Sequence, residues 1–268
     1  MLLTNKNAVV YGGGGAIGGA VARAFASEGA RVFLGGRSRA KLDAVVQDIS
    51  AAGGRAEAAV LDALDEQAVN GHAQAVAEQG GRIDIALNAV GILHVQGTPL
   101  AELSYDEFAH PLHAYARTNF LTARAVGLQM TKQRSGVIFT LSTPGSRLPV
   151  GAGYLGIGTA CAATESLTRH MAAELGPSGV RVICLRPDAI PEAVAQHSHS
   201  EEVFGKAARA AGITIEALLA QHQANAPLLR RLPTLAEVAN MAAFLASDQA
   251  SAMTGAIVNL TCGSMVDF

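Results

Sequence analysis

The sequence predicts an α/β fold, a doubly wound parallel sheet of seven strands in one domain over residues 1–268. Short apolar runs alternate with longer segments of helical period, which favours right-handed strand–helix–strand units and therefore a parallel sheet. Half of the 268 residues are hydrophobic and only 16% are charged, as strands covered on both faces require. A chain of this length can bury such a two-sided core.

The elements are expected in strict alternation. The expected strands are residues 8–11, 32–34, 58–61, 83–88, 137–141, 180–185 and 256–260. The expected helices between them are residues 17–28, 39–52, 66–79, 115–133, 159–175 and 235–246. Residues 188–233 are the least regular, with one expected helix at 215–224. They follow the sixth strand, so we expect a helical lid over a ligand cleft, since long connections are often functional.

Composition excludes several classes of partner. The formal charge of −2 provides no basic surface for nucleic acid. No apolar segment is long enough to span a bilayer, and because the first strand is expected so early we expect no signal peptide. The three cysteines have no metal-binding spacing and are expected to be reduced thiols. We therefore expect a cytoplasmic protein with a small-molecule substrate and no metal.

A glycine-rich turn joins the first strand to the first helix. In that context glycines let the backbone approach a pyrophosphate, and the helix N-terminus supplies free N–H donors and a favourable dipole. The predicted nucleotide contacts are Gly12, Gly14, Gly15, Ile17 and Gly18. The alternative is a glycine-rich turn that binds no ligand.

Further segments in order resemble the short-chain dehydrogenase/reductase family over roughly residues 5–265. They are Asn88-Ala89-Val90-Gly91, Thr118-Asn119-Phe120, Pro187-Asp188 and the stretch 235–255. The resemblance implies a Rossmann-like fold, a nicotinamide dinucleotide and a homo-oligomer, either a dimer or a tetramer. It also implies cofactor contacts at Asp62, Asn88, Ala89, Gly91 and Pro187, although Asp62 could instead be a helix N-cap.

The end of the second strand bears on the choice between NADP(H) and NAD(H). NAD-dependent enzymes place an acidic residue there to bind the ribose hydroxyls, whereas this chain has Gly36 followed by Arg37. A guanidinium can bind a 2′-phosphate through two hydrogen bonds. The sequence therefore favours NADP(H) over NAD(H). The alternative for Arg37 is a solvated cation at the start of a helix.

The family's catalytic Tyr-x-x-x-Lys pair falls on Ile157 and Cys161, so the resemblance implies an atypical active site. Tyr154 stands seven residues before Cys161, a spacing similar to that of the enoyl-acyl-carrier-protein reductases. Either Ser142 or Thr143 ends the fifth strand and could take the role of the family's serine. The remaining candidates are Asn119, for a proton relay, and His94; Arg147 and Arg186 could supply a replacement cation.

The missing lysine has a chemical consequence. A tyrosine without a cation beside it has a pKa near ~10 and stays neutral at pH 7. It can donate a proton, but it is a poor general base. We therefore expect an NADP(H)-dependent reductase of a carbonyl or an activated alkene. The alternatives are a nucleotide-binding or regulatory protein without turnover, and a partner subunit of a heteromer.

Overall fold

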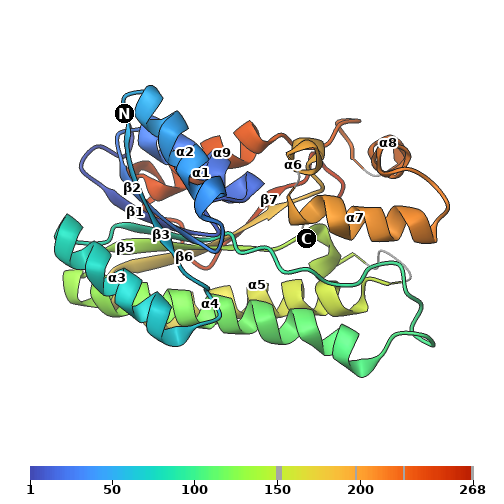
Figure 1. Ribbon diagram of the computed structural model, residues 1–268. Helices are drawn as coiled ribbons and strands as arrows, with labels where there is room; N and C mark the ends of the chain where they lie inside the picture. Colours follow the sequence, from blue (N-terminus) through green and yellow to red (C-terminus); the bar gives the residue numbers. More distant parts are fainter. Residues whose placement is uncertain (149–152, 197, 226, 267–268) are drawn as a thin grey trace.

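The computed structural model describes residues 1–148, 153–196, 198–225 and 227–266, and it is built around one parallel sheet (Figure 1). The seven strands lie in the order β3-β2-β1-β4-β5-β6-β7. They are β1 (Asn7–Tyr11), β2 (Arg31–Gly36), β3 (Arg55–Val60), β4 (Ile85–Asn88), β5 (Gly136–Leu141), β6 (Val180–Pro187) and β7 (Ile257–Leu260). The predicted fold class, a doubly wound seven-stranded parallel sheet, is confirmed.

Helices cover both faces of this sheet. One face carries α1 (Ala16–Ser27), α2 (Arg39–Ala51) and α9 (Leu235–Ala246), and the other carries α3 (Glu66–Gly80), α4 (Tyr105–Gln133) and α5 (Leu155–Leu175) (Figure 1). Because successive strand residues point to opposite faces, Val10 packs in the core with Phe25 of α1. Its neighbour Val9 packs in the second core with Val126 of α4.

The order of the strands reverses between β1 and β4, and such a switch point opens a crevice at the carboxyl ends of the strands. Tyr11 and Asn88 are in register at the ends of these two strands. The Ala89 N–H donates to the Tyr11 carbonyl across 2.8 Å. The glycine-rich turn after β1 and the loop after β4 therefore begin side by side.

Most predicted elements begin or end at slightly different residues in the structure, and α4 and β3 show the physical reasons. Helix α4 begins at Tyr105 rather than residue 115, because Ser104 and Glu107 form a reciprocal capping box and the helix accommodates Pro111. Strand β3 spans Arg55–Val60 rather than 58–61. It lies at the edge of the sheet and none of its residues is fully buried, so it lacks the apolar run that marks the central strands.

The segment after β6 forms three helices at one end of the sheet (Figure 1). They are α6 (Pro191–Ala195), α7 (His199–Ala210) and α8 (Ile215–Asn225). Only α8 was expected from the sequence. Helix α7 buries Val203 and Ala208, whereas no residue of α8 is buried. In the part of the chain that the structure describes, no helix is both long and apolar enough to cross a membrane.

Candidate active site

A cavity of about 1210 Å³ opens at the carboxyl ends of the strands and runs from the glycine-rich turn to the lid helices. It exceeds the ~300–1,000 Å³ of ordinary ligand pockets, so it has room for an extended ligand. The predicted residues that line it are Gly12, Gly14, Gly15, Ile17, Arg37, Asp62, Ala89, Gly91, His94, Ser142, Thr143, Tyr154 and Pro187. Gly18, Asn88 and Asn119 were also predicted but are not among its lining residues.

The glycine-rich turn has the close backbone approach that a dinucleotide requires. Gly12 has a φ of 76°, and a Cβ there would lie 2.4 Å from the Ala89 carbonyl oxygen. A Cβ at Gly14 would lie 2.9 Å from the Lys41 Cβ. Helix α1 begins with Gly15 as its N-cap and has no side-chain cap. Its first N–H groups therefore remain available to an anion, and this end of the cavity fits a pyrophosphate.

The three predicted residues outside the cavity support its wall from behind. A Cβ at Gly18 would lie 2.3 Å from the Gly12 carbonyl oxygen, so this glycine permits close packing of α1 on the turn. Asn88 donates from Nδ2 to Oδ1 of Asn119 across 2.9 Å. Asn119 donates from its own Nδ2 to the Tyr115 carbonyl, also across 2.9 Å. The asparagine pair thus ties the end of β4 to a turn of α4.

The end of the cavity beside the carboxyl ends of β2 and β3 is lined by Arg37 and Asp62, and Arg37 is exposed. Asp62 accepts a hydrogen bond from the Leu64 N–H across 2.9 Å. The alternative reading of Asp62 as the cap of the next helix is wrong, because Asp65 caps α3 by accepting from two N–H groups of its first turn. Asp62 is therefore held in a turn on the cavity wall.

The part of the cavity between the glycine-rich turn and the lid helices is lined by Thr143, Tyr154, Ile157 and Cys161. The Thr143 hydroxyl donates to the Cys161 Sγ across 3.6 Å. Burial raises the pKa of the Cys161 thiol to about 11, so it stays protonated at neutral pH. The pKa of Tyr154 is also raised, first by burial and then by the negative charge of Asp188.

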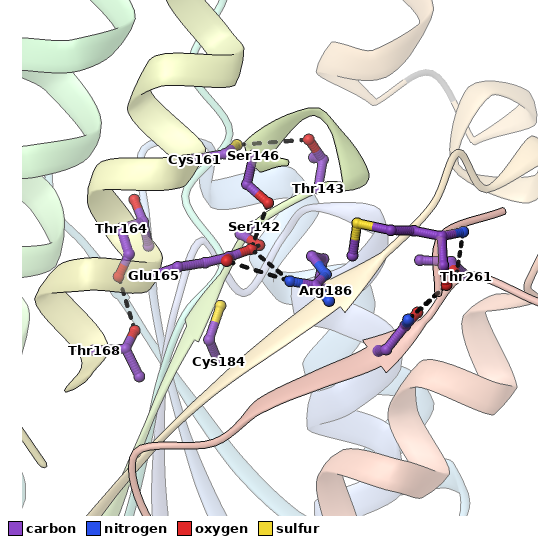
Figure 2. Close-up of polar contacts among 12 residues, drawn as sticks. Ser142, Thr143, Ser146, Cys161, Thr164, Glu165, Thr168, Cys184, Arg186 and Thr261 are labelled. Atoms are coloured by element: carbon purple, nitrogen blue, oxygen red, sulfur yellow. Dashed lines mark hydrogen bonds and ion pairs between the residues drawn. The ribbon is translucent and has the colours of Figure 1, made fainter. Parts of the chain in front are cut away.

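Ser142 and Thr143 differ in what their hydroxyls contact. Ser142 donates to Oε1 of Glu165 across 2.6 Å, and Ser146 donates to the same oxygen at the same distance (Figure 2). Arg186 donates from Nη1 to both carboxylate oxygens at 3.2 Å. Glu165 and Arg186 are both almost completely buried. Ser142 is thus bound into a buried ionic cluster, whereas the described partner of the Thr143 hydroxyl is a thiol.

Neither predicted replacement cation lines the cavity. Arg186 is held by Glu165, and Arg147 is also absent from the cavity wall. His94 does line it, but both of its ring nitrogens are engaged. Its Nδ1 lies 2.8 Å from the Ile92 carbonyl oxygen and its Nε2 lies 2.9 Å from the Gln96 amide nitrogen. Burial lowers the pKa of His94, so the ring is neutral at physiological pH.

Several residues of this region were assigned no role from the sequence, although Asp188 belongs to one of the family-like segments. Asp188 lines the cavity and contacts His222 of α8 at 2.9 Å from each carboxylate oxygen. It also accepts from Ser264. Tyr115 of α4 lines the same cavity. These contacts join positions far apart in the chain, so no local spacing could have indicated them. Among the described residues, no group of three or more His, Cys, Asp and Glu is placed to hold a metal.

Comparison with known proteins identifies the family. A family model described as enoyl-(acyl carrier protein) reductase matches residues 14–264. A protein of Streptomyces virginiae assigned as a ketoacyl reductase of monensin polyketide synthase is 32% identical, with 99% of this chain and 98% of that protein covered. The chain belongs to the short-chain dehydrogenase/reductase family. The fold of this oxidoreductase family accounts for the sheet, the crevice and the glycine cradle.

Solved structures of short-chain dehydrogenase/reductases superpose over almost the whole chain. NAD⁺-bound xylitol dehydrogenase is 26% identical with a TM-score of 0.86, covering 98% of this chain and 100% of that one. A protein of Burkholderia xenovorans assigned to the same family is 29% identical with a TM-score of 0.84, covering 98% and 97%. A nicotinamide dinucleotide is thus the family's cofactor, and the cradle around Gly12 fits it.

Proposed function

We propose that this protein is an NADP(H)-dependent reductase of a carbonyl or an activated alkene, with Tyr154 as its proton donor. The observation that supports this proposal most directly is the environment of the Tyr154 side chain. Its side chain lines the cavity, and its hydroxyl has no hydrogen bond to the described residues. Its pKa is raised rather than lowered. Such a phenol is protonated at neutral pH, so it can donate to a substrate oxygen, whereas no phenolate is present to remove a proton.

A coenzyme held at the Gly12–Gly15 turn would supply the hydride for the substrate carbon, and the side chains of the protein act on the substrate oxygen. Tyr154 transfers its proton to that oxygen as negative charge develops there. The Thr143 hydroxyl, whose described partner is only the weak acceptor Sγ of Cys161, turns to donate a hydrogen bond to the same oxygen. Ser142 instead holds the start of the loop after β5 through Glu165, and neutral His94 forms part of the wall.

The substitutions Ile157 and Cys161, at the positions of the family's tyrosine and lysine, determine the favoured direction. Among the described residues, the charge that shifts the pKa of Tyr154 is the negative Asp188 carboxylate, which disfavours a phenolate. Alcohol oxidation needs the phenolate as a base. We therefore expect carbonyl reduction at neutral pH to be faster than oxidation of the corresponding alcohol.

A ketone is the preferred substrate class, since the relative from Streptomyces virginiae is assigned as a ketoacyl reductase. The test follows NADPH absorbance with ethyl acetoacetate and with cyclohex-2-enone, using wild type, Y154F and Y105F. Tyr105 is the first residue of α4, on the same face of the sheet as α5, and it is 74% exposed. Y105F is therefore a matched control. We expect kcat to fall at least about 100-fold in Y154F and to stay unchanged in Y105F. Full activity in Y154F would contradict the role of Tyr154.

The loss of the usual tyrosine and lysine also favours a second candidate, a nucleotide-binding protein without turnover. The same assay separates the two, because such a protein would bind NADPH and consume none with either substrate. Binding is measured by calorimetry on the same samples. NADPH binding without oxidation would replace the reductase proposal with this one.

The expected preference for NADP(H) over NAD(H) depends on Arg37. We expect R37A to raise the KM for NADPH about 10-fold or more, as loss of a charge-assisted contact implies. The KM for NADH should change little, because NADH has no 2′-phosphate. R39A is the control, since Arg39 is paired with Asp43 at 2.8 Å and does not line the cavity. Equal effects of R37A on both coenzymes would contradict the assignment.

A further inference from the structure

Tyr115 lies where a dinucleotide would pass from the cradle towards the lid. The loop after β4 begins beside the glycine-rich turn, because Ala89 is in contact with Gly12. It continues through Gly91 and Ile92, which also line the cavity. In a nicotinamide dinucleotide, the group that follows the pyrophosphate on this side is the second ribose. A pyrophosphate held at the start of α1 therefore brings that ribose to the loop formed by residues 89–92.

The hydroxyl of Tyr115 is directed at this loop. It accepts a hydrogen bond from the Ile92 N–H across 3.4 Å, and no described residue accepts its proton. Burial, and then the neighbouring Cys161 thiol, raise the pKa of Tyr115 above its ordinary value. The phenol therefore keeps its proton at all physiological pH values. It also has unused donor capacity at a point where the wall meets the ligand.

The backbone that carries Tyr115 is held in place by three side chains. Asn119 donates to the Tyr115 carbonyl at 2.9 Å, and Thr118 donates to the same carbonyl at 3.3 Å. Asn88 in turn donates to Asn119 at 2.9 Å. The end of β4 and this turn of α4 are thus fixed relative to each other. A side chain on such a support loses little conformational freedom when it binds a ligand.

We propose that the Tyr115 hydroxyl donates a hydrogen bond to the nicotinamide-side ribose of the bound coenzyme. A ribose offers hydroxyl groups that can accept from a phenol. Cys161 of α5 lines the same cavity as Tyr115, and its buried, protonated thiol is a weak hydrogen-bond donor. The contact therefore falls to the tyrosine. This inference rests on the proposed coenzyme but not on turnover.

The test measures binding by calorimetry for wild type, Y115F and Y105F. The two ligands are NADP⁺ and adenosine 2′,5′-bisphosphate, which has the adenosine half and lacks the second ribose. We expect Y115F to weaken NADP⁺ binding about 5-fold, as the loss of one neutral hydrogen bond implies. Its affinity for the bisphosphate should stay unchanged, and Y105F should match wild type with both ligands.

The outcomes separate this inference from the proposed coenzyme. Unchanged NADP⁺ affinity in Y115F, with wild type binding normally, overturns the ribose contact alone. Equal weakening of both ligands also overturns it, because the substitution would then have disturbed the whole cavity. If wild type binds neither ligand, the coenzyme proposal fails and the ribose contact fails with it. Thermal melting of Y115F within a few degrees of wild type establishes that the variant is folded.

Discussion

At the scale of single residues, Glu165 is a buried charged group with several polar partners. Its carboxylate is buried and satisfies Ser142, Ser146 and Arg186 together (Figure 2). The ion pair joins α5 to β6, and the two serines join it to the loop after β5. A buried ion pair adds little net stability by itself, but the loss of one partner leaves the other charge uncompensated.

We therefore expect E165A to lower the free energy of unfolding by about 3–5 kcal/mol, measured by urea denaturation. The control is E66A, which removes an ion pair to Arg124 in which both side chains are about half exposed. That change should cost about 1 kcal/mol or less. A stability of E165A within 1 kcal/mol of wild type would show that the buried guanidinium finds other compensation.

At the scale of elements, the lid helix α8 makes a titratable contact with the end of the sheet. Helix α8 has no buried residue, and its His222 contacts Asp188 at the end of β6. The hydrogen bond to Asp188 raises the pKa of His222 above its ordinary value of 6.5. Burial alone would raise the pKa of Asp188, but the hydrogen bonds from His222 and Ser264 outweigh it and lower that pKa.

These directions determine how docking of α8 depends on pH. The contribution of protonated His222 is complete below its unfolded pKa near 6.5 and is lost as the pH rises through its raised folded value. On the acid side, the contribution of Asp188 is lost only as the pH falls through its lowered pKa. The contact is therefore strongest between those two values.

Hydrogen exchange of residues 215–225, corrected for the intrinsic rate, should accelerate as the pH rises through the raised pKa of His222. In H222Q that pH dependence should disappear, and protection should be low throughout. H113Q is the control, because His113 is an exposed residue of α4. Protection of α8 that is independent of pH in wild type would show that the ion pair between His222 and Asp188 does not hold this helix.

At the scale of the whole molecule, α4 leaves apolar side chains uncovered on its outer surface. Phe120 and Leu128 are 53% and 56% exposed and lie two helical turns apart on one face. We propose that this face contacts a second copy of the chain in the expected homo-oligomer. The double variant F120E/L128E should then reduce the mass measured by light scattering. L100E, which changes a 74% exposed leucine in the loop before α4, should not. A monomeric wild type would contradict the proposed oligomer.

Local pattern in the sequence was sufficient for most of the fold. The apolar runs predict the central strands because their residues are buried on both faces wherever the strand lies. The glycine-rich turn predicts the cradle because Gly12 must adopt a positive φ beside another backbone segment. Pattern was insufficient at the start of α4, where Pro111 lies within the helix, and at β3, whose edge position leaves it half exposed.

The sequence by itself determined the sheet and the nucleotide cradle, because periodicity and turn chemistry are properties of neighbouring residues. Only the tertiary structure decided how the polar groups around the cavity are paired. Glu165 lies on α5, where a charged residue would be expected to face solvent, yet it forms an ion pair with Arg186 in the core. Asp188 contacts His222 of the lid, and Tyr115 of α4 lines the same cavity as Cys161 of α5. Such contacts depend on which distant segments the topology brings together, and no local pattern encodes that.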